Sequence, residues 1–290
     1  MDVTDVYLYA GFLIGWLAGR RWPAHGAWVG RASLASVVVL LGLLGASLRV
    51  IAPTTLVTVL PGAVLFAVAV LGFTAGFYLL LRRLEAPADA PAGIPAPTGR
   101  ERVPTSLVLL AALLTGYGVG QLAALPTGLL IPAALTLLLG LIGYGVELRL
   151  SSVRRAWLPL TSAAAGALAT ALLVGMVGGI GWVASLATAL GFGWYSLTGP
   201  LVAARLGAAL GLYAFLANFL REGLTMILAP YLGPRLRGEG LAALGGATSM
   251  DTTLYFVVRY GEARAGALAV ASGLTLTVAA SLVVPLVLAL

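Results

Sequence analysis

The stretch LVTVLPGAVLFAVAVLGFTAGFYLLL, residues 56–81, indicates the fold class, because its 26 residues contain no charge. A helix needs roughly 20 apolar residues to cross the hydrocarbon core of a bilayer. Comparable stretches recur along the chain, at about 5–20, 32–51, 56–81, 105–124, 128–148, 157–181, 206–230 and 264–289. Backbone in hydrocarbon must satisfy its own hydrogen bonds, so each stretch is expected to be helical. The sequence predicts an all-α polytopic membrane protein with about eight transmembrane helices.

Composition and charge support the same class. Of the 290 residues, 60% are hydrophobic and 9% are charged, whereas soluble domains are about one quarter charged. The net charge of +7 comes from arginines clustered at the ends of apolar stretches: Arg20, Arg21 and Arg31; Arg82, Arg83, Arg100 and Arg102; Arg149, Arg154 and Arg155; Arg235 and Arg237. This is the positive-inside pattern and not a nucleic-acid-binding face. We therefore expect a multi-pass protein of the cytoplasmic (inner) membrane with both termini outside.

Few chemistries of catalysis or metal binding fit the sequence. The chain has no Cys and one His, His25, which excludes disulfides and thiolate metal sites and leaves a metal cluster without ligands. Ser196 has no membrane-embedded His or Lys to activate it, and there is no HExxH motif. We expect neither an enzyme nor a cofactor.

A Pro- and Ala-rich segment divides the chain. Residues 82–104 are predicted to form a cytoplasmic linker between an N-terminal three-helix unit, 1–81, and a C-terminal membrane unit, 105–290. Residues 42–49 (GLLGASLR) resemble residues 140–149 (GLIGYGVELR), and a glycine-rich helix precedes each segment. An odd number of spans separates the copies, which predicts an inverted repeat of the kind found in secondary transporters. The same glycines have a simpler interpretation as sites of close helix packing.

Two segments do not read as ordinary spans. Residues 191–200 (GFGWYSLTGP) and 245–253 (GGATSMDTT) place glycines and hydroxyls between apolar pieces too short to cross alone. They predict re-entrant hairpins at about 182–208 and 241–262, whose tips meet. Pro200 is expected to mark the start of the second arm of the first hairpin. The alternative is two surface turns.

Charged residues within the apolar stretches are candidate functional groups. Asn218, Glu222 and Thr225 share one predicted helix face, and Asp251 lies at the second hairpin tip. A charge at the bilayer centre costs at least about 2.5–3.5 kcal/mol, so such residues usually face a partner or a water-filled path. The structural alternatives are that Arg221 pairs with Glu222 or reaches the interface, and that Asp251 only caps a helix.

The segments 191–200, 218–224 (NFLREGL) and 245–251 (GGATSMD) resemble the hallmark stretches of the LysO family of lysine exporters, most strongly over 185–260. The resemblance implies export of L-lysine and its analogue thialysine in exchange for protons, with the essential acids at Glu222 and Asp251. One departure is that Val50-Ile51-Ala52 follows residues 45–49, where the family can carry an acid.

On this reading lysine and protons compete for two carboxylates, and no other coupling ion is expected. The candidate substrate-binding residues are Asn218, Trp194, Tyr195, Ser196, Thr198, Gly199, Thr248 and Ser249. The expected partners are L-lysine, related basic amino acids and the lipid bilayer, and a homodimer stays open. The alternative function is a channel or uniporter without proton coupling.

Overall fold

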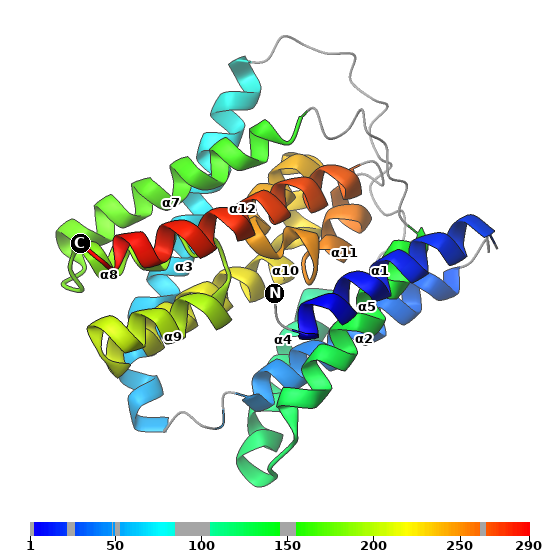
Figure 1. The fold of residues 1–290 in the computed structure, drawn as a ribbon, viewed down its shortest axis with the longest axis horizontal. Helices are drawn as coiled ribbons and strands as arrows, with labels where there is room; N and C mark the ends of the chain where they lie inside the picture. The colour runs from blue at the N-terminus through cyan, green and yellow to red at the C-terminus, as the bar shows by residue number, and fades with distance from the viewer. Residues whose placement is uncertain are drawn as a thin grey trace. The chain divides into compact units, whose positions relative to one another are not determined.

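The computed structural model describes residues 3–21, 27–47, 49, 53–84, 105–145, 155–261 and 265–290. All regular elements in these ranges are helical, and a helix overlaps each of the eight predicted spans (Figure 1). The elements are α1 (Val3–Arg21), α2 (Ala27–Ser47), α3 (Pro53–Leu84), α4 (Thr105–Leu122), α5 (Thr127–Gly145), α7 (Trp157–Val177), α8 (Trp182–Ala189), α9 (Tyr195–Leu206), α10 (Ala208–Gly245), η2 (Gly246–Met250), α11 (Leu254–Phe256), η3 (Val257–Gly261) and α12 (Ala265–Val287). The predicted all-α class is confirmed.

Four helical stretches in these ranges are long and apolar enough to span a bilayer: Val57–Leu84, Trp157–Val177, Ala208–Met250 and Ala265–Val287. Shorter apolar helices cover Arg31–Ser47, Leu107–Leu122 and Thr127–Leu141. A multi-pass membrane protein is therefore supported, and the count of eight spans stays a prediction.

The helices form two compact units that are not consecutive in sequence. The first comprises Met1–Ala52 with Gly99–Leu148, and the second comprises Pro53–Thr98 with Arg149–Leu290. The predicted linker lies mostly outside the described residues, but its first residues, 82–84, form the last turn of α3. The division at 82–104 therefore stays a prediction from residue 85 onward.

In the first unit, α1 packs against α5 and α2 packs against α4. A side chain at Gly15 would overlap the backbone carbonyl of Gly140, and one at Gly116 would overlap that of Gly42. Contacts advance along both helices of each pair in the same direction, so both pairs are parallel. Glycines allow this approach because a Cβ atom would occupy the space of the neighbouring backbone.

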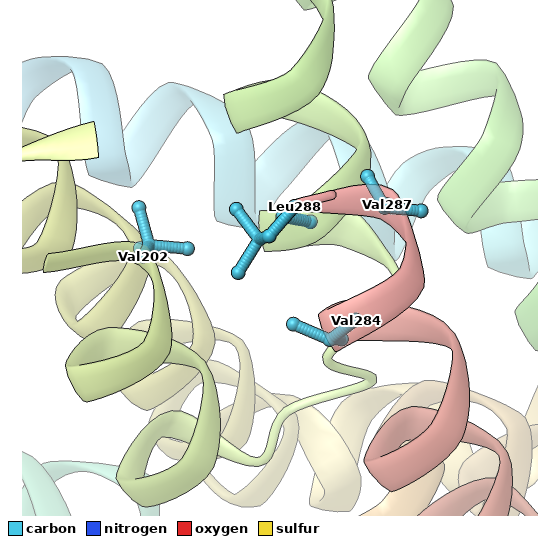
Figure 2. Packing of buried hydrophobic residues seen from close by; sticks show 6 residues of the cluster. Val202, Val284, Val287 and Leu288 are labelled. Atoms are coloured by element: carbon cyan, nitrogen blue, oxygen red, sulfur yellow. The ribbon is translucent and has the colours of Figure 1, made fainter. Parts of the chain in front are cut away.

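In the second unit, α3 packs against α7 and α10, α9 packs against α10, and α12 runs beside α7 and contacts η2 (Figure 1). At one end, side chains from α9 and α12 meet, with Val202 facing Val284 and Leu288 (Figure 2). Val287, Ala187 of α8 and Ala214 of α10 complete this buried cluster. The apolar cluster therefore joins both arms of the first predicted hairpin to α10 and α12.

Two boundaries differ from those predicted. The helix expected to end near residue 230 stays helical up to Arg237, whose backbone is non-helical (φ 56°, ψ −174°) and breaks α10 into two helices. The short second helix of α10, which ends at Gly245, forms the first arm of the second predicted hairpin. The second arm of the first hairpin begins at Tyr195, which places Pro200 inside α9 and not at its start. The earlier start is accommodated by a left-handed backbone at Phe192 and Gly193, which turns the chain back before Trp194.

Candidate functional site

The first predicted hairpin, in the second unit, consists of helix α8, a turn and helix α9. Its turn has positive φ values at Phe192 (50°) and Gly193 (94°), so its backbone groups need partners outside a regular helix. Asn218 of α10 supplies them. Its Oδ1 accepts a hydrogen bond from Gly193 N at 2.7 Å, and its Nδ2 donates to the carbonyl oxygens of Thr188 (2.9 Å) and Ala214 (3.0 Å). Predicted as a substrate ligand, Asn218 here fixes the turn.

The second helix–turn–helix breaks at η2. Its hydroxyl groups donate to nearby carbonyls: Thr248 to Gly245 and Thr253 to Thr248, while Ser249 shares its one proton between the carbonyls of Gly246 (2.8 Å) and Ala269 of α12 (2.9 Å). These hydroxyls thus bind backbone carbonyls of the interrupted segment and, through Ser249, of α12. In this structure the predicted ligands Thr248 and Ser249 serve the local fold.

The two tips meet. The backbone N–H of Ala247 donates to the carbonyl of Phe192 at 2.9 Å. Gly246 has φ 64°, and a side chain there would overlap the same carbonyl. Residues more than 50 positions apart are therefore held together by backbone contact, as the tip-to-tip arrangement predicted.

Both candidate acids lie beside this junction. The side chain of Glu222 is 1% exposed, and neither carboxylate oxygen has a hydrogen-bond partner among the described residues. Asp251 Oδ1 accepts hydrogen bonds from the backbone N–H and the hydroxyl of Thr252. Glu222, Asp251 and the hydroxyl of Tyr195 of α9 lie close enough together for their charges to interact. An acid on α10, an acid on the second tip and an aromatic hydroxyl on the first thus converge.

Arg221 has neither of its two expected roles. It is 1% exposed, so it does not reach the interface, and no ion pair joins it to Glu222. Instead its Nε donates to the carbonyl of Leu244 at 3.0 Å, and its Nη2 to that of Ala243 at 3.2 Å. Consecutive residues on a helix point about 100° apart, which separates its charge from that of Glu222.

The remaining predicted ligands lie along the start of α9. The indole N–H of Trp194 donates to the hydroxyl of the exposed Ser196 at 3.0 Å, and the Tyr195 ring packs edge-on against Phe215 and Phe219 of α10. Thr198 is buried and donates to the carbonyl of Trp194. Gly199 is also buried and packs against α10. Of these predicted ligands, Trp194 and Tyr195 are partly exposed and Ser196 is exposed, whereas Thr198 and Gly199 are buried.

Comparison with known proteins places this arrangement in a family. The family model described as "Lysine exporter LysO" matches residues 107–288, which include both tips, Glu222 and Asp251. The chain belongs to the lysine exporter LysO family. It is also similar to the lysine exporter LysO of Escherichia coli (strain K12), with 41% identity over 105 residues, a match that spans 36% of this chain and 33% of that relative. No solved structure is similar to it.

In this LysO family member, sequence reasoning missed Thr252, whose backbone N–H and hydroxyl both donate to Asp251. Its position directly after a candidate acid was the available signal. A second missed group lies at the α10 kink, where Glu239 contacts Arg155 and the Tyr78 hydroxyl, both at 3.5 Å. These groups come from α3, α10 and the turn two residues before α7, so their proximity follows from packing and not from sequence spacing.

Two further acids of the sequence, Glu147 near Arg149 and Glu262 beside Arg259 and Arg264, were the weaker candidates for a functional role, and both fall outside the described residues. Within the described ranges, no three His, Cys, Asp or Glu side chains lie close enough to hold a metal ion.

Proposed function

We propose that the protein exports L-lysine and its analogue thialysine from the cytoplasm by proton antiport, with Glu222 and Asp251 carrying the protons. The observation that carries this proposal is the buried, unpartnered carboxylate of Glu222 next to Asp251 at the junction of two broken helices. Membership of the lysine exporter LysO family supplies the substrate class.

The coupling follows from charge balance. Two carboxylates in a medium of low dielectric constant resist being ionised together without a counter-charge. Protons or the ammonium groups of lysine can each supply that charge. Binding of one lowers the affinity of the two carboxylates for the other. Competition for Glu222 and Asp251 therefore converts a proton gradient into release of lysine on the outer side.

The membrane potential sets the energetic demand. Moving a cation outward against an inside-negative potential costs about 2.3 kcal/mol per 100 mV. One proton moving inward cancels this cost for a substrate with a net charge of +1. A uniporter would leave the cost uncompensated, which is why we prefer antiport for an exporter.

We further propose that the helix–turn–helix segments are re-entrant hairpins and that the first unit contains an inverted repeat. If Gly42 of one copy corresponds to Gly140 of the other, the contact of Gly15 with Gly140 is equivalent to that of Gly116 with Gly42. Such exchanged contacts are those expected of two copies related by a two-fold axis. Parallel pairing of α1 with α5 and α2 with α4 supports opposite orientation of the copies. Rocking of repeats would then alternate access to the site.

At the first tip, Trp194, Tyr195 and Ser196 are the proposed substrate contacts, because they precede or begin α9 and are partly or fully accessible. A ring face would add a cation–π contribution of about 0.5–2 kcal/mol to binding of an ammonium group. Positive-inside charge supports a cytoplasmic location for the arginine clusters, with both termini outside.

The test measures lysine-dependent proton movement in proteoliposomes for the wild type, Glu222→Gln and Asp251→Asn. Glu239→Gln is the matched control, since it makes the same substitution on α10 at a residue paired with Arg155 away from the tips. We expect proton flux that requires a basic amino acid in the wild type and in the control, and none in either site variant.

Three outcomes would contradict the proposal in different ways. Lysine flux without proton flux would indicate a channel or uniporter. Coupled flux that survives Glu222→Gln would remove the carboxylate mechanism. Absence of flux with every basic amino acid would refute the substrate class.

A further inference from the structure

Arg221 is a buried cation with one donor group left over. Its guanidinium is 1% exposed, and Nε and Nη2 are bound by the carbonyls of Leu244 and Ala243. Nη1 is buried and has no hydrogen-bond partner among the described residues. A buried, charged donor without a partner costs more than a neutral one, so a function that uses it is expected.

The guanidinium lies where the two tips meet. Its Nη2 is 2.9 Å from the position that a Cβ atom would take at Gly246, and its Cδ is 3.9 Å from that position at Gly193. The absence of side chains at both glycines leaves the guanidinium bordered by backbone. This is the same junction at which Ala247 donates to Phe192.

The charge of Arg221 is only partly compensated by the protein. Leu244 and Ala243 belong to the last turn of α10, which ends at Gly245. The C-terminal end of a helix carries a charge equivalent to about −0.5. Since neither Glu222 nor any other described acid forms an ion pair with Arg221, about half a positive charge is left. An anion is the ligand that completes such a site.

Arg221 and Glu222 are consecutive residues of α10, so their opposite charges point in different directions. A zwitterionic amino acid carries both charges and needs a partner for each. A carboxylate ligand for a planar guanidinium is also geometrically favourable, because Arg matches carboxylates with paired N–H donors.

We infer that Arg221 binds the α-carboxylate of the transported amino acid through Nη1 and thereby distinguishes amino acids from simple diamines. This inference rests on the proposed function and adds a residue that selects the substrate. The hydroxyls of Thr198, Thr248 and Ser249 are less suited to this carboxylate, because each already binds a backbone carbonyl. Glu222 and Asp251 keep their role toward the ammonium groups.

The experiment compares L-lysine with 1,5-diaminopentane, which has the same carbon chain and terminal ammonium group but no carboxylate. Dissociation constants for both compounds are measured separately, by titration of the full-length protein in lipid nanodiscs. We expect the wild type to bind lysine at least about tenfold more tightly, as a charge-assisted hydrogen bond implies.

The variants are Arg221→Gln, which removes the charge, and Arg221→Lys, which keeps it without the planar donor pair. Arg205→Gln is the control, because Arg205 is an exposed arginine at the end of α9. In Arg221→Lys we expect the dissociation constant for lysine to rise about tenfold and that for 1,5-diaminopentane to change less than about threefold. Should Arg221→Gln fail to fold, Arg221→Lys and the wild-type comparison still decide.

A purely structural role would weaken binding of both compounds equally, and that result would overturn the inference. So would a wild type that binds both compounds with the same affinity, while lysine export itself would stand. If the wild type binds neither compound, the proposed function fails and this inference fails with it.

Discussion

Asn218→Ala is the most informative single test of how the site is built. Asn218 is 3% exposed, and its amide bonds Gly193 N, Thr188 O and Ala214 O. Ala214 O also has its helical partner in α10, so its loss is minor. Gly193 N and Thr188 O lie in and before the broken tip, and the amide of Asn218 is the partner that holds each of them.

The expected loss follows from these two groups. A buried backbone group left without its partner costs about 1–3 kcal/mol, so two groups give about 2–6 kcal/mol. The matched control is Thr225→Ala on the same helix face. Thr225 is buried too, at 1% exposed, but its hydroxyl bonds only Arg221 O within its own helix, and even hydrogen bonds between membrane helices average only about 0.6 kcal/mol.

Thermal unfolding in detergent, followed by intrinsic tryptophan fluorescence, measures the difference. For chains of roughly this size, 1 kcal/mol shifts Tm by about 2–4 °C, so Asn218→Ala should lower Tm by at least about 4 °C and Thr225→Ala by about 2 °C or less. Equal shifts for the two variants would refute the reasoning, because they would mean that the first tip does not depend on Asn218.

Two further substitutions test close backbone contacts. Gly246→Ala should lower both Tm and lysine flux, because φ is 64° and a side chain would overlap Phe192 O; Gly223→Ala on α10 has open space and should be neutral or slightly stabilising. Similar Tm values for the two variants would contradict the observed tip contact. Gly15→Val should destabilise the first unit, whereas Gly118→Val, where nothing lies within 4 Å, should be tolerated. The rate of limited proteolysis measures this difference, and equal cleavage rates for the two variants would refute the described helix packing.

Much of the fold was predictable from local sequence. Residues 56–81 alone require a helix of membrane-spanning length, and the structure places α3 there. The two polar, glycine-rich segments were predicted to interrupt helices, and both do. Such features follow from composition and hydrogen-bond satisfaction within one segment, so they need no knowledge of neighbours.

Boundaries and roles were harder to predict where packing overrides local preference. Pro200 has the signature of a helix start, yet α9 begins at Tyr195, because the turn before it is fixed by Asn218 from another helix. In the same way, Pro230 and Pro234 favour an end to the first helix of α10, but its backbone stays helical past both prolines, up to the break at Arg237.

The sequence by itself determined the membrane class, the broken helices and the two acids, because a charge or a glycine in an apolar stretch is conspicuous wherever the chain folds. Only the tertiary structure decided what those residues contact: Arg221 binds the carbonyls of Ala243 and Leu244 and not Glu222, and Ala247 meets Phe192. The physical reason is that these partners are more than 20 residues apart. Which donor meets which carbonyl depends on how helices pack, and spacing within one helix contains no such information.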